Sequence, residues 1–415
     1  MEPNPDTRRS LLFLLAGIVV FVGLLTWIVG WALPLVIFAI IFIVMFHEFG
    51  HFITAKRAGM KVTDFFVGFG PVLWSTTIGE TRYGVRAILA GGYVKVPGMT
   101  WTETIPEDEE ARTYRSASYP RKVLFASAGS LMHVVMALAL AWAALTFVGL
   151  PSSSHVGVYD FTKWQGHSEN AAQLAGMKAG DQIVAINGVA ISSDSQLQRI
   201  VSQDSGRRIA IEVQRNGRTL TLHATPVYGP TLTVNGKPLA ARGYLGVSLE
   251  NLSVRDSWFV AIPGSVTEVG SLLGTAVHAI VHVFSPGEFS SLFQQVASPT
   301  AATNPKNQLT RPESIVGVVR IAVQSTSTGP GDLLLILMAV NIFVGVLNML
   351  PMLPLDGGYV AIATYERLRS RRGIRYHADV NKMAPIIYAF MGVLLILFAT
   401  TLFLDIAHPI ANPFH

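Results

Sequence analysis

Cysteine is absent from the sequence and charged residues are scarce: Asp, Glu, Lys and Arg together make up only 14% of the chain. The lack of cysteine excludes disulfide bridges and metal sites built from thiolates. The scarcity of charge, with 50% hydrophobic residues and a mean hydropathy of +0.44, is typical of a membrane protein. The net charge of +5 does not indicate nucleic acid as a partner, since much of the basic excess lies beside apolar segments, where it fits topology signals and anionic lipid.

The longest run without a charged residue extends from Leu11 to Phe46. As one helix it would be about 54 Å long, whereas the hydrocarbon core of a bilayer is about 30 Å thick. We therefore predict two spans joined by a tight turn between Gly30 and Pro34. A cleaved signal peptide is the alternative for the first span, but residues 3–9 form a weak basic region and no small-residue cleavage motif follows, which favours a retained helix.

Three further apolar segments, 122–149, 332–355 and 384–404, bring the expected number of transmembrane helices to about five. Basic residues cluster at three places: before the first span, between 56 and 121, and between 366 and 382. The positive-inside rule places all three in the cytoplasm. The long segment between the third and fourth spans then lies outside the membrane, on the extracytoplasmic side.

That outer segment contains a soluble domain, for which we predict residues 151–255. Its most regular part predicts a strand at 182–186, a helix at 195–202, and strands at 209–213 and 219–224. Asn-Gly pairs at 187–188 and 216–217 predict tight hairpin turns, and a third pair at 235–236 indicates an added hairpin. This order resembles an α+β PDZ domain of the bacterial type, whose groove accepts an extended peptide or a substrate C-terminus by strand addition.

Residues 256–330 follow this domain and are harder to interpret. Ser257–Phe284 is apolar enough to pass for another span, but Pro263, several glycines and two histidines interrupt it, and a further crossing would invert the later topology. We therefore predict an amphipathic helix lying on the membrane surface, followed by a linker.

On the cytoplasmic side, residues 80–96 read as two short apolar strands around Gly91 and Gly92, which predicts a β-hairpin. The segment is too apolar for a free loop. Either it packs on the membrane domain, or it is a re-entrant hairpin whose open edge meets a substrate. On the second interpretation Gly91, Gly92, Tyr93 and Val94 are substrate-binding residues.

Three ionisable residues, His47, Glu48 and His51, stand in the motif HEFGH at the end of the second predicted span. A charged group in hydrocarbon costs at least about 2.5 kcal/mol, so the cluster needs a partner or a function. On a helix the two histidines lie on one face, one turn apart, with Glu48 beside them. Two imidazoles at this spacing can share a zinc ion, while the carboxylate takes a proton from a water molecule; this is the chemistry of amide hydrolysis.

The motif alone is of limited specificity, since HExxH arises by chance in roughly one chain in a hundred of this length. A second pair, His278 and His282, has the same spacing, but alanine occupies the position of the glutamate. A third zinc ligand is therefore needed, and Asp356 in NMLPMLPLDGG is the candidate. Two prolines interrupt the span before it, and the number of crossings brings Asp356 to the same side and depth as HEFGH.

The sequence strongly resembles the site-2 protease family of intramembrane zinc metalloproteases. The resemblance covers these two motifs, the glycine pair of the hairpin, residues 127–133 and the PDZ segment. The resemblance implies zinc bound by His47, His51 and Asp356, and Glu48 as the catalytic base. It also implies that Asn348 steadies the substrate or the developing oxyanion. It further implies cleavage of a single-pass membrane helix, often in an anti-sigma factor already cut once, and location in a bacterial plasma membrane.

The predicted organisation is an extra N-terminal helix at 1–33 and a catalytic core split between 34–150 and 331–415, with the inserted segments between them. One departure concerns Gly129–His133, where the family usually has G-P-x-x-N. His133 is then either a histidine hydrogen-bonded within the helix bundle or a group that contacts a zinc ligand or substrate.

Two other classes of function stay open on the residues alone: a membrane scaffold that presents a PDZ domain, and a metal or proton transporter. No inverted repeat supports a transporter. A scaffold would not need Glu48.

Overall fold

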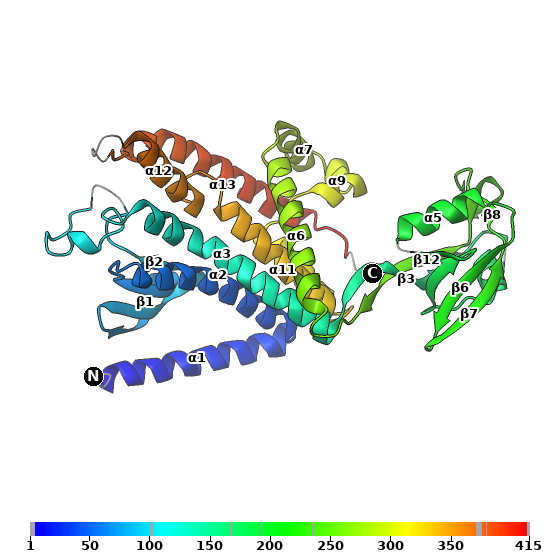
Figure 1. Ribbon diagram of the computed structural model, residues 1–415, viewed down its shortest axis with the longest axis horizontal. Coiled ribbons are helices and arrows are strands. Elements are labelled where there is room, and N and C mark those ends of the chain that lie inside the picture. Colours follow the sequence, from blue (N-terminus) through cyan, green and yellow to red (C-terminus); the bar gives the residue numbers. More distant parts are fainter. Residues whose placement is uncertain are drawn as a thin grey trace. The chain divides into compact units, whose positions relative to one another are not determined.

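The computed structural model describes residues 5–99, 103–166, 168–191, 193–234, 236–370, 376–378 and 380–412. It divides into two compact units, shown in Figure 1. The membrane unit comprises the residues up to Ala141 and from Pro263 onwards, and the inserted unit comprises Trp142–Ile262.

Among the described residues, six helices are long and apolar enough to cross a membrane. They are α1 (Pro5–Val29), α2 (Ala32–Arg57), α3 (Tyr119–Ala143, continued by a π-helical turn at Ala144–Val148), α6 (Ala261–Val283), α11 (Pro330–Asn348) and α13 (Ala384–Ala407). The chain is therefore a polytopic helical membrane protein, as expected. Five of the six match the predicted spans, and the sixth, α6, is the segment for which we predicted a place on the membrane surface.

The predicted turn between the first two spans is confirmed. Gly30 has a φ of +85°, a backbone conformation that glycine adopts without a steric cost, and it separates α1 from α2. Pro34 lies in the first turn of α2, where its missing N–H has no helical partner to lose.

The chain between α6 and α11 forms four more helices: α7 (Pro286–Ala297), α8 (Pro299–Ala302), α9 (Pro305–Thr310) and α10 (Ile315–Ser325). The prediction of a linker in this segment is therefore wrong, because most of its residues are helical. Pro299 and Pro305 each occupy the first turn of a short helix, a position that favours proline, and so they start helices instead of preventing them.

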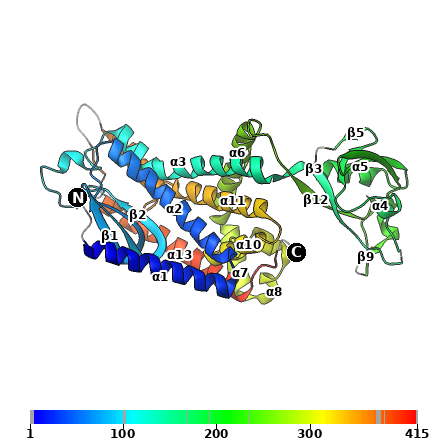
Figure 2. The same cartoon turned by 90° about the horizontal axis from the view of Figure 1, so that it is seen from below.

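Helices α2 and α11 run in the same direction, and α3 runs opposite to both (Figures 1 and 2). The additional helices after α6 therefore do not reverse α11 relative to α2. Buried side chains of α2, α10 and α11 form one cluster: Val36, Ala322, Leu333 and Leu337. This packing fixes α2, which carries His47 and His51, against α11, after which the chain leads to Asp356.

The β-sheet of the membrane unit is larger than predicted. Strand β1 (Asp64–Ile78) pairs with β2 (Thr81–Lys95), and the turn lies at Gly79 and Glu80. The prediction of a hairpin turning at Gly91 and Gly92 is therefore wrong, since both glycines lie within β2. In the register, Phe65 pairs with both Tyr83 and Val94, so the first part of β1 is flanked by two parts of β2. Residues 92–95 form an edge of this sheet.

The fourth predicted span ends earlier than expected. Helix α11 stops at Asn348, and an irregular segment containing Pro351 and Pro354 leads to α12 (Asp356–Arg369). Both prolines lack the N–H that would continue the helix, which accounts for the break. Asp356 consequently starts a new helix and does not end the old one.

The inserted unit contains a sheet with the strand order β12–β3–β4–β6–β7, and β5 (Val189–Ala190) pairs with β4. The strands are β3 (Leu150–Phe161), β4 (Gln182–Ile186), β6 (Ile209–Arg215), β7 (Arg218–Ala224) and β12 (Val247–Val254), and the helices are α4 (Ala171–Leu174) and α5 (Asp194–Gln203). All predicted strands and the predicted helix are present.

Two predicted hairpin turns are confirmed, because Asn187 and Asn216 both have positive φ angles. The third turn includes Asn235, which lies outside the described residues. Two pairs of short strands complete the unit: β8 (Val227–Tyr228) pairs with β11 (Gly243–Tyr244), and β9 (Thr233–Val234) pairs with β10 (Lys237–Pro238).

Candidate metal centre

Three side chains from two distant parts of the sequence meet at the end of α2. Nε2 of His47 lies 3.2 Å from Nε2 of His51, and Oδ2 of Asp356 lies 3.3 Å from the first nitrogen and 3.2 Å from the second. Both histidines are buried. In the described part of the chain this is the one group of three His, Asp or Glu donors close enough to share a metal ion.

The spacing of the three donor atoms fits a tetrahedral ion. Zinc at about 2.0–2.1 Å from each donor would place neighbouring donors about 3.3–3.4 Å apart, close to the three observed distances. Asp356 Oδ2 is buried and has no hydrogen-bond partner among the described residues. A carboxylate oxygen directed at two imidazole nitrogens, with no proton donor of its own, is suited to a cation.

His51 is held by the neighbouring helix α3. Its Nδ1 lies 2.8 Å from the backbone oxygen of Phe125, and because a carbonyl only accepts, Nδ1 carries the proton. Nε2 then keeps its lone pair for a metal, which is the usual arrangement of a metal-binding histidine.

Gly129 on α3 lies directly against the two imidazoles. A Cβ at this position would come within 2.5 Å of both His47 Nδ1 and His51 Nε2, closer than real Cβ atoms approach. The absence of a side chain here leaves room for the donor atoms.

Glu48, half-buried, faces the edge of the β-sheet. A Cβ on Gly92 would lie 3.2 Å from Glu48 Cγ and 2.7 Å from Met45 Sδ, so β2 passes in close contact with α2 at this glycine. The backbone of Val94 on the same strand also lies near the Glu48 carboxylate. The structure thus brings together the metal-binding group, Glu48, and the Gly91–Val94 segment that the sequence predicted to bind substrate.

Asp356 is positioned by a tight return of the chain. Cβ atoms on Gly357 or Gly358 would collide with backbone atoms of the segment before α12: with the Leu350 carbonyl for Gly357 and with Leu353 for Gly358. The glycines of the LDGG motif therefore allow α12 to start against this segment. Asn348, half-buried, is the last residue of α11 and lies at the same end of the membrane unit.

His133 lies next to the three donors but outside the group. Its ring centroid is 5.1 Å from that of His47, and its Nδ1 lies 2.7 Å from Oδ1 of Asn341 on α11. Asn341 Nδ2 in turn donates to the His133 backbone oxygen at 2.8 Å. Asn341 was missed by the sequence reasoning. An amide inside an apolar span is a signal that would have pointed to it.

The second histidine pair does not form a comparable site. His282 Nδ1 lies 3.5 Å from Oε2 of Glu288, while both His278 and His282 are exposed. Neither histidine belongs to a group of three metal-binding side chains among the described residues.

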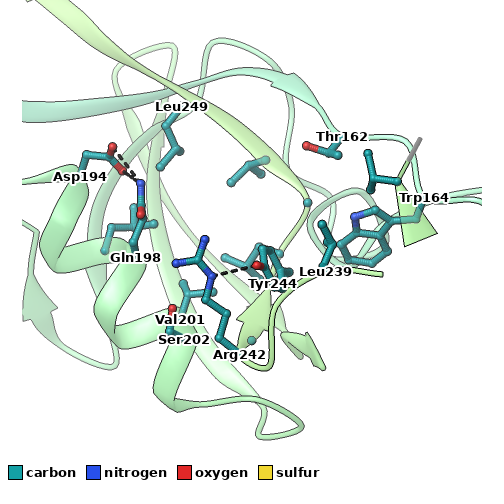
Figure 3. Close-up of a pocket in the computed structure, with 16 residues that line it drawn as sticks. Thr162, Trp164, Asp194, Gln198, Val201, Ser202, Leu239, Arg242, Tyr244 and Leu249 are labelled. Atoms are coloured by element: carbon teal, nitrogen blue, oxygen red, sulfur yellow. Dashed lines mark hydrogen bonds between the residues drawn. The ribbon is translucent and has the colours of Figure 1, made fainter. Parts of the chain in front are cut away.

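The inserted unit has a cavity of about 460 Å³ next to α5. Figure 3 shows Asp194, Gln198, Val201 and Ser202 of α5 along one side of it. Its remaining lining is mainly apolar and includes Leu239, Leu245, Val247 and Leu249, together with Trp164. Arg242, whose Nε donates to the Tyr244 hydroxyl at 2.9 Å, adds a cationic group.

Comparisons with known proteins agree with this geometry. The profile of peptidase family M50 matches residues 35–397, a range that includes all three donors and Glu48. Zinc metalloprotease Rip1 of Mycobacterium tuberculosis is 31% identical over 402 residues, covering 90% of this chain and 96% of the relative. Rip1 of Mycolicibacterium smegmatis is 29% identical, covering 92% and 98%.

A chloroplast relative, membrane metalloprotease ARASP of Arabidopsis thaliana, is 26% identical and covers 88% of this chain and 77% of its own. The relatives are named as zinc or membrane metalloproteases, and the donor set found here suits the same metal. The chain therefore belongs to peptidase family M50, the site-2 proteases, and is a membrane-embedded zinc metalloendopeptidase.

Proposed function

We propose that this enzyme hydrolyses a peptide bond within or near the transmembrane helix of a single-pass membrane protein. The substrate class that fits best is a regulator of the anti-sigma factor type, already shortened by a first protease. One observation carries the proposal: His47, His51 and Asp356 converge beside Glu48 and an open strand edge at one end of the helical unit.

In this proposal, His47, His51 and Asp356 hold the zinc ion. Bound zinc polarises the substrate carbonyl and acidifies a water molecule, so that hydrolysis proceeds near neutral pH. Glu48 accepts the proton of the attacking water and passes it to the leaving amide nitrogen. Asn348 contacts the substrate carbonyl as negative charge develops on its oxygen.

The substrate must lose its helical hydrogen bonds before cleavage, because a helix hides its amide groups. Segment Gly91–Val94 is proposed to accept the unwound chain as an additional strand. The backbone oxygen of Lys95 accepts from Thr63 N at 3.0 Å, so the backbone groups of Lys95 point toward the chain at the start of β1. Backbone groups alternate in direction along a strand, and those of the neighbouring Val94 therefore point away from β1. Backbone groups of Val94 are thus directed toward Glu48, where the scissile bond must lie.

We also propose that the inserted unit is a PDZ domain on the extracytoplasmic side, with the metal centre near the cytoplasmic face. The strand and helix order and the cavity beside α5 support the first part, and the distribution of basic residues supports the second. The cavity would accept an extended peptide or a substrate C-terminus. The domain would also exclude substrates that carry bulky outer domains.

Co-expression with candidate single-pass membrane proteins tests the proposal. We expect the wild-type enzyme to release a cytoplasmic fragment, Glu48→Gln to keep its zinc and release none, and His47→Ala to lose the metal. A scaffold or transporter would be unaffected by Glu48→Gln. Fragment release by the Glu48→Gln variant at the wild-type rate would therefore reject Glu48 as the base.

A further inference from the structure

The two zinc-binding histidines of the proposed site are supported unequally. A histidine that binds a metal through Nε2 carries its proton on Nδ1, and this N–H normally donates to a carbonyl, a carboxylate or a water. His51 meets this rule through the Phe125 carbonyl. His47 Nδ1 is buried and forms no hydrogen bond of acceptable geometry with the described residues, although the Gly129 carbonyl lies near this ring.

A matching acceptor lies on the neighbouring ring. Asn341 uses its Nδ2 to donate to the His133 backbone oxygen, which fixes the orientation of the amide and leaves Oδ1 as the acceptor for His133 Nδ1. His133 therefore carries its proton on Nδ1, and its Nε2 presents a lone pair. Nε2 too is buried without a partner in the described structure, in a side chain that is 1% exposed.

The unmatched donor and the unmatched acceptor belong to rings whose centroids are 5.1 Å apart. Buried polar groups without a partner are rare, because leaving one unpaired destabilises the folded protein. The two atoms are not bonded to each other in the structure. A hydrogen bond between them, through one buried water or after a small rotation of a ring, would satisfy both at once.

We propose that His133 is a positioning residue for His47: its Nε2 accepts the His47 Nδ1–H, and Asn341 holds His133 in the tautomer that makes this possible. The chain Asn341, His133, His47 then orients the first zinc ligand as Phe125 orients the second. This inference rests on the proposed ligand set. It gives a function to the histidine that replaces the asparagine usual in the family.

The surroundings are shaped for this contact. A Cβ on Gly345 of α11 would lie 2.7 Å from His133 Cβ and 3.0 Å from its Cγ, so α11 approaches α3 closely at this point. Ser130 Oγ donates to the Gly345 carbonyl at 2.9 Å and ties the same two helices together. Ser130 thus offers a matched control, because its hydrogen bond crosses the same interface without involving His47.

The test measures zinc affinity of the purified full-length protein by competition with a chelator, alongside the thermal unfolding of the metal-free form. We expect His133→Phe to weaken zinc binding about 10–100-fold, as the loss of such partners does elsewhere. Asn341→Leu should weaken it in the same direction. Ser130→Ala should lower the unfolding temperature but leave zinc affinity unchanged.

Zinc affinity unchanged in His133→Phe would overturn the proposal and leave the Gly129 carbonyl, the other acceptor near this ring, as the partner of His47. If Ser130→Ala lost as much zinc affinity as His133→Phe, the loss would come from disturbed packing of α3 against α11, and the positioning role of His133 would be rejected. The His47→Ala variant tests the proposed ligand set separately from the role of His133. If His47→Ala still binds zinc normally, the ligand set itself is wrong.

A second measurement does not depend on a variant that folds. Nitrogen NMR of the wild-type protein with labelled histidines reports which ring nitrogen carries each proton. We expect Nδ1–H for both His47 and His133 in the zinc form. An Nε2–H tautomer of His133 would exclude it as an acceptor and overturn the proposal.

Discussion

Single residues show how much the metal centre depends on the lack of a side chain. Gly129 sits in the middle of α3, where alanine would favour the helix by roughly 1 kcal/mol. Its Cβ would nevertheless overlap the imidazoles of His47 and His51. Local helix preference and the site therefore make opposite demands on this position.

We expect Gly129→Ala to lower zinc affinity at least about tenfold, because the ligands must shift by more than a few tenths of an ångström. The measurement is zinc content after dialysis against a weak chelator. Gly392→Ala in α13 is the matched control, since a Cβ there meets nothing within 4 Å. Full zinc retention in Gly129→Ala would show that α3 can move away from the ligands.

The carboxyl group of Asp181 should make the folding stability of the inserted unit depend on pH. Burial alone would raise the pKa of this carboxyl, but hydrogen bonds from Arg215 and from the Lys178 amide outweigh burial and hold its pKa below the usual range. The folded unit therefore binds this proton less readily than the unfolded chain. The stabilisation is present above about pH 4, the unfolded value, and is lost as the pH falls through the folded value.

Hydrogen exchange of the β4 and β6 amides in the full-length protein checks this expectation. Protection should fall as the pH is lowered below about 4, with exchange rates corrected for the direct effect of pH. In Asp181→Asn, protection should be lower at neutral pH and change less on acidification. An equal fall in both proteins would assign the effect to other carboxyl groups.

Among the secondary-structure elements, the β1–β2 sheet has the most direct consequence for catalysis. Its edge at residues 92–95 passes Glu48, and a strand edge with unpaired backbone groups is a template for another strand. We propose that the backbone N–H of Val94 contacts the substrate chain. Proline at this position would remove that N–H.

We expect Val94→Pro to abolish cleavage of a membrane substrate while zinc stays bound. Val94→Ala keeps the backbone N–H and should retain most of the activity. Zinc content and fragment release, measured on both variants, separate loss of substrate binding from loss of the site. Wild-type cleavage by Val94→Pro would rule out binding along this edge.

The elements that the sequence predicted well are those set by local signals. The apolar runs placed the five spans, and the Asn-Gly pairs placed two hairpin turns, because length and positive φ are local properties. Strand β1 was missed because Gly68, Gly70 and Pro71 oppose strand formation, and only its pairing with β2 stabilises it. The three proposed ligands were chosen from spacing and topology, whereas Asn341 and Gly129 matter only through the contact of α3 with other helices.

At the scale of the whole molecule, the inserted unit leaves and returns to the membrane unit through one pair of strands. Leu150 of β3 pairs with Val254 of β12, so the two connections lie side by side. A short flexible linker between them could therefore replace the unit without separating α3 from α6.

We expect this deletion to leave zinc binding and cleavage in place and to widen the range of substrates, so that proteins with large outer domains are also cut. Fragment release from a pair of substrates that differ only in the size of the outer domain is the measurement. Complete loss of cleavage with zinc still bound would contradict a filtering role and assign the unit a direct part in catalysis.

The division of the metal centre between α2 and the start of α12 also has a consequence for biosynthesis. A ribosome that has completed α2 has made two of the three donors, and Asp356 is synthesised only after the whole inserted unit. A partly made chain therefore has no complete hydrolytic centre. On the proposed ligand set, we expect newly inserted neighbours in the bilayer to be protected from cleavage until translation has passed Asp356.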